Sequence, residues 1–182
     1  MKWLNAARET ADAMLAKFWD REDGGFFFTS PKHKNLIARD KPVFDGAEPS
    51  GNSMAAIGLL RLAKLTGEAE YYDKAERVLR INHVNLESAP RAQQKMLCAV
   101  DFYLNPPKEI TIAGETGGHD VHNLLTALHR HYVPNKVLAF IDPDGRNAGQ
   151  VRDAVPLLNA KTPIEGKAAV YVCRDYTCLQ PV

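Results

Sequence analysis

The sequence predicts a mainly α-helical chain that ends in a small α/β unit, with helical hairpins followed by a three-stranded parallel sheet. Two observations lead to this fold class. Over residues 1–104, apolar side chains recur at helical spacing in several separate stretches. After Pro106 and Pro107, short apolar runs alternate with helical stretches, which is typical of β-α-β units. We therefore expect a helical-hairpin region over 1–104 and a β-α-β-α-β unit over 105–182.

The first expected helix covers residues 2–19, where apolar side chains fall on one helical face. The Asp-Gly-Gly sequence at 23–25 ends it, because adjacent glycines favour a turn. The aromatic run at 26–29 is expected to be extended and to form half of a small hairpin. Residues 30–49 form a polar loop with three prolines. A loop of this length is uncommon in a compact domain and is often functional.

Three more helices are expected in the helical region. One starts near Ser50 to Ser53 and ends at Gly67, a second contains Tyr71 to Ile81, and a third covers about 89–104. The connections between these later helices are short. Short connections favour antiparallel neighbours, so the region is predicted to consist of helical hairpins.

The second region contains three expected strands and two expected helices. The strands lie at 109–113, 137–141 and 168–173, and the helices at 119–131 and 146–158. The middle strand is a continuous apolar run, which is typical of a strand covered on both faces. This β-α-β-α-β order predicts a small three-stranded parallel sheet with right-handed crossovers.

Composition limits the classes of function. The chain has 182 residues, 45% of them hydrophobic, and a net charge of +1, so it has material for a packed core. Basic and acidic residues balance in both regions, which argues against nucleic acid or an anionic membrane as partner. No apolar run is long enough for a membrane helix. Three cysteines are too few for a disulfide-rich secreted scaffold, and a cytoplasmic location is expected.

A dense polar cluster precedes the second expected helix. Together with the glycine turn it supplies six candidate ligand-binding residues: Asp23, Asp45, Glu48, Ser50, Asn52 and Ser53. Two interpretations are open. The serines or asparagine can cap the helix while the carboxylates bind backbone N–H groups. Alternatively, hydroxyls and free N–H groups at the helix start can bind a small sugar or an anion. The pattern assigns no catalytic residue.

Cysteines and histidines offer other chemistry. Cys173 and Cys178 are candidate redox residues that can form a disulfide, can supply two thiolates to zinc, or can be unbonded thiols. His119 and His122 stand three apart on an expected helix, but no third ligand has suitable spacing. We therefore expect no metal and no cofactor.

Four segments resemble one known family, in the same order along the chain. They are Asp23–Phe27, Asp45–Ser53, Met96–Leu104 and Cys173–Pro181. The family comprises the bacterial YyaL-like proteins and their animal relatives, the spermatogenesis-associated thioredoxin-domain proteins. Its members have an N-terminal thioredoxin-like domain followed by an (α/α)₆ toroid similar to those of six-hairpin glycosidases. This chain resembles only the C-terminal portion, without the thioredoxin-like domain and most of the toroid.

The resemblance implies that residues 1–104 are the last hairpins of an incomplete (α/α) toroid. It also implies that loop carboxylates lie at the mouth of a cavity related to glycoside chemistry. We expect a non-catalytic interaction or ligand-binding module. The alternatives are a carbohydrate-binding or carbohydrate-processing remnant, and a thiol redox accessory module.

Assembly follows from the same incomplete ring. Too few helices are present to close a toroid, so apolar helix faces are left to be covered. A homo-oligomer, most simply a two-fold dimer, is expected. The alternative is that residues 105–182 fold over the open side and leave a monomer.

Overall fold

The computed structural model describes residues 1–33, 36–174, 177–179 and 181. The chain forms two compact units. The first contains Met1–Ala63 and Glu68–Leu104, and the second contains Lys64–Gly67 and Asn105–Val182. The last residues of one helix are therefore part of the second unit.

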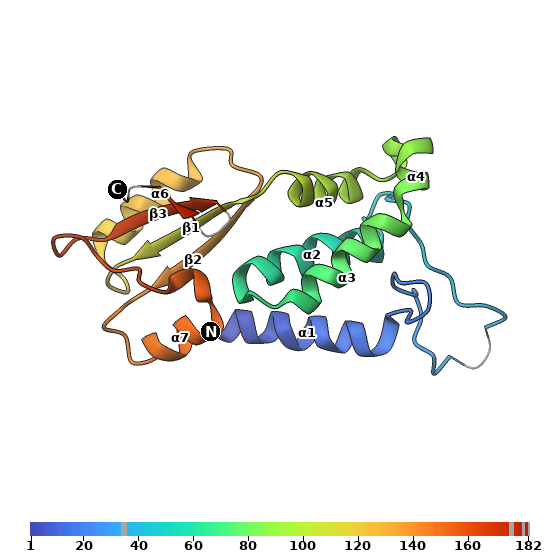
Figure 1. The fold of residues 1–182 in the computed structure, drawn as a ribbon, viewed down its shortest axis with the longest axis horizontal. Coiled ribbons are helices and arrows are strands. Elements are labelled where there is room, and N and C mark those ends of the chain that lie inside the picture. The colour runs from blue at the N-terminus through green and yellow to red at the C-terminus, as the bar shows by residue number, and fades with distance from the viewer. Residues whose placement is uncertain (34–35, 175–176, 180, 182) are drawn as a thin grey trace. The chain divides into compact units, whose positions relative to one another are not determined.

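Helices dominate the first unit (Figure 1). They are α1 (Lys2–Phe18), α2 (Gly51–Thr66), α3 (Ala69–Ile81), α4 (His83–Ser88), the 3₁₀ turn η1 (Pro90–Ala92) and α5 (Gln94–Leu104). The helices expected over 2–19 and from Ser50 to Gly67 are confirmed. Gly67 follows α2 with a φ of 74°, a left-handed conformation that suits glycine. The helix expected over 89–104 begins only at Gln94, because Pro90 opens a separate 3₁₀ turn.

The core of the first unit lies among α2, α3 and α5. The fully buried side chains include Leu59 and Leu60 of α2, and Met96 and Phe102 of α5. Helix α3 buries Tyr71, Ala75, Val78 and Leu79, which share one helical face. In contrast, Ala11 is the one buried residue of α1. Helix α1 therefore contributes far less to this core than α2, α3 and α5 do.

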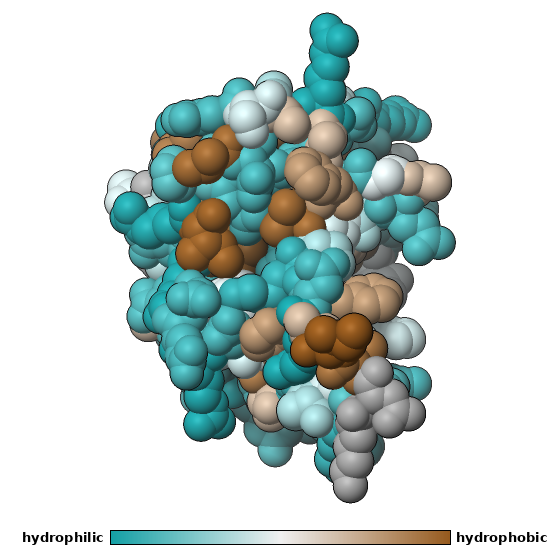
Figure 2. Space-filling model, turned by 90° about the vertical axis from the view of Figure 1, so that its right-hand side faces the viewer, coloured by the Kyte–Doolittle hydropathy of each residue, from teal (hydrophilic) through white to brown (hydrophobic). Residues whose placement is uncertain are grey.

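A tight turn follows α1. Trp19 and Phe26 form an isolated antiparallel bridge, which confirms a small hairpin at Phe26. The expected extended segment is shorter than predicted, because Phe28 and Thr29 lie in a bend. Gly25 has a φ of 78°, and a Cβ atom there would lie 2.8 Å from Cδ1 of Ile81. Glycine is required at this position by both its conformation and its close approach to α3. On the side of the molecule that carries this turn and α4, apolar side chains lie in separate groups among hydrophilic ones (Figure 2).

The second unit is built on a mixed sheet (Figure 1). Its described strands are β1 (Lys108–Ala113), β2 (Lys136–Ile141), β3 (Ala169–Arg174) and β4 (Thr177–Cys178). They are arranged in the order β2-β1-β3-β4, and its helical elements are α6 (His119–His129), α7 (Ala148–Ala154) and η2 (Pro156–Leu158). Strand β1 is parallel to β2 and antiparallel to β3. Strands β3 and β4 are antiparallel.

The predicted three-stranded parallel sheet is therefore wrong in strand number and in direction. A parallel return would carry the chain back along the whole length of β2, about 20 Å for a six-residue strand. The expected helix over 146–158 is shortened to α7, whose seven residues rise only about 10 Å. Pro156 starts a 3₁₀ turn instead. The chain enters β3 opposite the end of β1, pairing Ala169 with Ala113.

In the described ranges, no helix is both long enough and apolar enough to cross a membrane.

Candidate functional site

Asp45 joins the beginnings of two helices. Its Oδ1 accepts a hydrogen bond from the Ser50 N–H at 2.8 Å. Its Oδ2 accepts from the N–H of Lys95 at 2.7 Å and of Met96 at 3.2 Å, in the first turn of α5. One carboxylate therefore satisfies backbone donors ahead of α2 and inside α5, where partial positive charge favours an anion.

The hydrogen bonds at Asp45 also determine its protonation. Burial alone raises the pKa of this carboxyl, but hydrogen bonds from Ser50, Ser53, Lys95 and Met96 favour the ionised form more strongly. The net effect is a pKa below its usual value. Asp45 is therefore held as a carboxylate whose oxygens face backbone donors.

The two serines close the start of α2. Ser50 Oγ accepts the Ser53 N–H at 3.1 Å and donates to Ser53 Oγ at 2.9 Å. Both side chains are buried. This is the geometry of a helix N-cap, in which a serine hydroxyl replaces the missing intrahelical partner.

Asn52 fastens the turn after α1 to the start of α2. Its Oδ1 accepts the Phe26 N–H at 2.8 Å, and its Nδ2 donates to the carbonyls of Phe26 and Pro42, both at 2.9 Å. The side chain is fully buried. All of its polar atoms are thus used by backbone groups from two distant segments.

The remaining two candidates lie outside these hydrogen bonds. The Asp23 side chain is 83% exposed, with a carboxylate oxygen 4.0 Å from Nζ of Lys41. Glu48 is exposed, and its backbone carbonyl accepts the Gly46 N–H. The structure therefore links Asp45 with Ser50 and Ser53 directly, joins Asn52 to the aromatic turn, and leaves the carboxylates of Asp23 and Glu48 elsewhere on the surface.

Cys173 and Cys178 form a disulfide between β3 and β4, in which the two residues are directly opposite. Cys173 is buried, whereas Cys178 is exposed. Nζ of Lys161 lies 2.8 Å from Sγ of Cys178. An ammonium at this distance stabilises a thiolate. The third cysteine, Cys98, is a free and exposed thiol.

The histidines do not gather around a common point. His119 lies within hydrogen-bond distance of Asn123, one turn along α6. Within the ranges that the structure describes, no three histidine, cysteine or acidic residues are placed to hold a metal ion.

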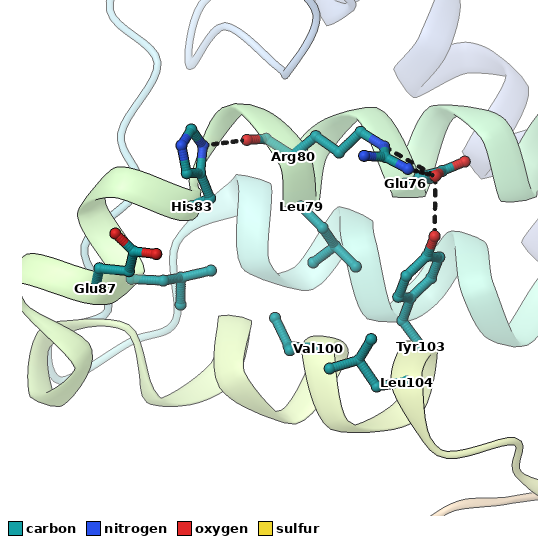
Figure 3. Close-up of a pocket in the computed structure, with 9 residues that line it drawn as sticks. Glu76, Leu79, Arg80, His83, Glu87, Val100, Tyr103 and Leu104 are labelled. Atoms are coloured by element: carbon teal, nitrogen blue, oxygen red, sulfur yellow. Dashed lines mark hydrogen bonds and ion pairs between the residues drawn. The ribbon is translucent and has the colours of Figure 1, made fainter.

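A hollow that the sequence reasoning missed lies between α3, α4 and α5 (Figure 3). Its volume is about 450 Å³. We call it the α3–α5 pocket, and it is lined by Glu76, Leu79, Arg80, His83, Leu86, Glu87, Val100, Tyr103 and Leu104. Aliphatic side chains cover most of its inner surface. The polar groups lie at both ends, with Glu76 and Tyr103 at one end and His83 and Glu87 at the other (Figure 3). A mainly apolar hollow with a few polar groups is common in small-molecule sites.

Glu76 is the centre of a hydrogen-bonded group at one end of this pocket. Its Oε1 accepts hydrogen bonds at 2.9 Å from Nε of Arg80 and from the hydroxyl of Tyr103. The Arg80 guanidinium, followed by the Tyr103 hydroxyl, lowers the pKa of Glu76. The hydrogen bond to Glu76, followed by burial, raises the pKa of Tyr103 to about 12. His83 Nδ1 lies 2.8 Å from the Arg80 carbonyl (Figure 3).

The sequence contains only residue spacings that are compatible with this pocket. Glu76 and Arg80 are four residues apart, so they share a face of α3. Val100 and Leu104 have the same spacing on α5. These pairs resemble ordinary surface and core positions, and only their meeting in space makes a pocket.

Comparison with known proteins identifies relatives of the whole chain. No family profile matches it. Human spermatogenesis-associated protein 20 is 33% identical over 181 residues, which is 99% of this chain, and the rat protein is 34% identical over the same share. The chain is homologous to a portion of spermatogenesis-associated protein 20. An uncharacterised protein of Caenorhabditis elegans is 26% identical over 183 residues and matches 100% of the chain.

The chain spans only part of these relatives. It matches 23% of the human spermatogenesis-associated protein 20 and 24% of the nematode protein. The expected resemblance is confirmed as homology to this protein. Because the match with spermatogenesis-associated protein 20 covers 99% of the chain, it includes both the helical unit and the α/β unit.

Proposed function

We propose that the chain is a non-catalytic ligand-binding module and that its ligand enters the α3–α5 pocket. The supporting observation is a difference between the start of α2 and the α3–α5 pocket in what their polar side chains bind. The carboxylate of Asp45 and the amide of Asn52 are held by backbone groups, so they are not free to take part in acid–base chemistry on a sugar. The polar groups of the α3–α5 pocket instead contact one another beside an aliphatic hollow.

The shape and chemistry of the pocket indicate the class of ligand. Leu79, Leu86 and Val100 offer apolar surface, which favours burial of a hydrocarbon or ring-shaped body. Arg80 offers its remaining guanidinium donors near the same opening, whereas the one O–H of Tyr103 already donates to Glu76. We infer a small molecule with an apolar body and one end that accepts hydrogen bonds.

A fragment screen followed by methyl NMR tests this proposal. Binding fragments are expected to shift the methyl signals of Leu79, Leu86 and Val100 in a saturable way. Leu104→Gln, at the pocket, is expected to weaken binding about tenfold, because it adds an amide to an apolar contact. Leu97→Gln is the matched control, since Leu97 is an exposed leucine of α5 outside the pocket. Equal effects of the two substitutions, or shifts confined to other parts of the chain, would overturn the proposal.

A thiol redox function is the second candidate, and the Lys161 contact favours it. A thiolate of a reducing dithiol attacks the exposed Sγ of Cys178, the S–S bond breaks, and Cys173 leaves as a thiolate that takes up a proton. The second thiol of the dithiol then displaces Cys178, and the dithiol departs as a disulfide. The Lys161 ammonium assists by attracting the incoming thiolate and stabilising the departing one.

Thiol counting tests the redox candidate. Before reduction only Cys98 should react with a thiol reagent, and all three cysteines should react after dithiothreitol treatment. Lys161→Gln is expected to slow reduction several-fold, whereas Lys167→Gln, which removes an exposed lysine of the same unit, should not. Equal rates for the two variants would remove the role of Lys161, and three reactive thiols before reduction would remove the disulfide.

We further propose that the chain corresponds to the C-terminal part of its relatives and that its helices are the hairpins of an incomplete toroid. We also propose that the chain pairs with a second copy through α1. Trp3 is 80% exposed although it lies on the same helix as the buried Ala11. Large exposed aromatic side chains are enriched at protein interfaces. Light scattering at micromolar concentration is expected to give a dimer, and Trp3→Lys a monomer. A wild-type monomer under these conditions would reject the pairing.

A further inference from the structure

A second hollow in the helical unit has a different character. It has a volume of about 380 Å³ and lies between the end of α1 and the beginning of α3. Its lining includes the indole of Trp19, one carboxylate from Glu70, and three cationic side chains, Arg21, Lys74 and Arg77. It shares no residue with the α3–α5 pocket, so nothing below depends on the function proposed above.

The three cations reach the hollow from two segments. Lys74 and Arg77 stand three residues apart on α3 and therefore share a helical face. Arg21 comes from the turn that follows α1. Within the described ranges, no carboxylate lies within ion-pair distance of any of the three. Their positive charge is thus not neutralised by a direct partner there.

Two of the cations are held in place. The Lys74 ammonium lies 4.8 Å from the centre of the Trp19 ring, a cation–π contact. Arg77 donates from Nε to the Asp23 carbonyl at 3.2 Å and from Nη2 to the Glu22 carbonyl. These bonds fix the guanidinium and leave its Nη1 donors for another acceptor. Side chains that are already ordered lose less conformational entropy when a ligand binds.

We propose that this hollow binds a small organic phosphate whose carbon skeleton carries hydroxyl groups. Guanidinium and ammonium groups are the side chains that recognise phosphate oxygens best, and Arg21, Lys74 and Arg77 supply both types. The Glu70 carboxylate repels a bare phosphate but accepts hydrogen bonds from hydroxyls. Together these groups favour a phosphate on a hydroxylated body over inorganic phosphate.

Tryptophan fluorescence provides a direct test with glycerol 3-phosphate as the probe. The exposed Trp3 is first replaced by Phe in every sample, so that Trp19 is the only tryptophan left. Saturable change in Trp19 emission is expected in the millimolar range or tighter. Inorganic phosphate should bind more weakly, and glycerol should not bind. Absence of saturation with glycerol 3-phosphate would overturn the proposal, and equal affinity for inorganic phosphate would overturn the hydroxylated body.

Substitutions locate the site. Arg21→Gln combined with Lys74→Gln should weaken binding about tenfold or more, because charge-assisted hydrogen bonds are lost. Arg91→Gln is the matched control for loss of a positive charge, since Arg91 is exposed on η1 outside this hollow. Glu70→Gln should tighten inorganic phosphate relative to glycerol 3-phosphate. Equal affinities in the double variant and the Arg91→Gln control would overturn the assignment, with circular dichroism reporting that each variant is folded.

Discussion

The start of α2 and the α3–α5 pocket contain the same chemistry in opposite settings. Asp45 is hydrogen-bonded through Ser50 and two backbone N–H groups of α5, and it joins segments distant in sequence. Glu76 is hydrogen-bonded by the side chains of Arg80 and Tyr103 beside an open hollow. A dense polar motif can therefore serve to hold distant segments of the backbone together. Sparse polar groups on helices can instead surround a binding site.

The two carboxyls also differ in why their pKa is low. At Asp45, burial opposes ionisation and several hydrogen bonds overcome it. At Glu76, the Arg80 guanidinium is the first cause. Removing Asp45 therefore leaves partly buried backbone donors without acceptors, whereas changes at the pocket leave groups that water can reach. The stability effects of substitutions should follow this order.

The largest effect is expected for Asp45→Ala. Three backbone N–H groups lose their acceptor, and each buried unsatisfied donor costs about 1–3 kcal/mol, so the free energy of unfolding should fall by at least ~3 kcal/mol. Urea denaturation measures the change. Glu48→Ala, an exposed acid of the same loop, is the control and should have almost no effect. Similar losses for the two variants would break the comparison.

Acid should also lower the free energy of unfolding by protonating Asp45. Asp45→Asn should remove this part of the pH dependence. Because the pKa of Asp45 in the folded chain lies below its usual 3.8, its contribution to stability is present above that value. The contribution is lost as the pH falls through the lowered pKa of the folded state. Urea denaturation between about pH 6 and pH 2 measures the free energy of unfolding at each pH. This free energy should fall less steeply toward low pH for Asp45→Asn than for the wild type. An identical pH dependence of the two proteins would mean that Asp45 titrates normally.

Asn52→Ala should come next. The substitution removes the hydrogen bonds to Phe26 and Pro42 and leaves buried backbone groups unpaired, at a cost of about 2–3 kcal/mol. Thermal unfolding followed by circular dichroism measures it. Asn85→Ala, on the short helix α4, provides a comparison where the asparagine side chain makes no such clamp in the described structure. A loss no greater than that of Asn85→Ala would contradict the clamp.

A smaller effect is expected for Ser50→Ala. Its hydroxyl caps the Ser53 N–H, and loss of a serine cap costs about 1 kcal/mol. Ser50→Thr retains a hydroxyl acceptor at the cap position and should restore part of the stability. Unchanged unfolding of Ser50→Ala would show that the Asp45 carboxylate alone is sufficient at this helix start.

The smallest effect is expected in the pocket. Tyr103→Phe removes the hydrogen bond to Glu76 at a half-buried position and should lower stability by about 1 kcal/mol or less. Both Tyr71 and Tyr103 should ionise near pH 12 in an absorbance titration of the wild type. The part that Tyr103→Phe removes is due to Tyr103, and this part should shift downward in Glu76→Gln. A loss of stability comparable with that of Asp45→Ala would mean that the hydrogen bonds of the pocket, too, hold the fold together.

The sequence predicts the helices of this chain better than it predicts which segments those helices contact. Local rules were sufficient for α1 and α2, since helical periodicity and Gly67 are encoded within a few residues. They fail for β3, because its direction depends on where the chain lies after the short helix α7. Likewise, the polar residues around Asp45 were recognisable from sequence. Which backbone donors they bind was not, because Lys95 lies far along the chain from Asp45.

The pocket was missed for a related reason. Leu79 and Val100 carry no local pattern that separates a residue facing a hollow from one inside the core. The same holds for Arg21 and Lys74, which look like ordinary surface charges until the chain brings them beside Trp19. Sites of this kind are properties of packing between helices and are not encoded in any one segment.

The final residues of α2 belong to the α/β unit, and this has a consequence for the order of synthesis. Lys64 lies 3.4 Å from the fully buried carboxylate of Glu109 on β1. The α/β unit is therefore discontinuous: its first part emerges from the ribosome with α2, and the rest follows only after α3, α4 and α5. A fragment starting at Asn105 would carry Glu109 without the Lys64 ammonium. A transferable version of this unit must include Lys64–Gly67, the part of the α2 region that belongs to it.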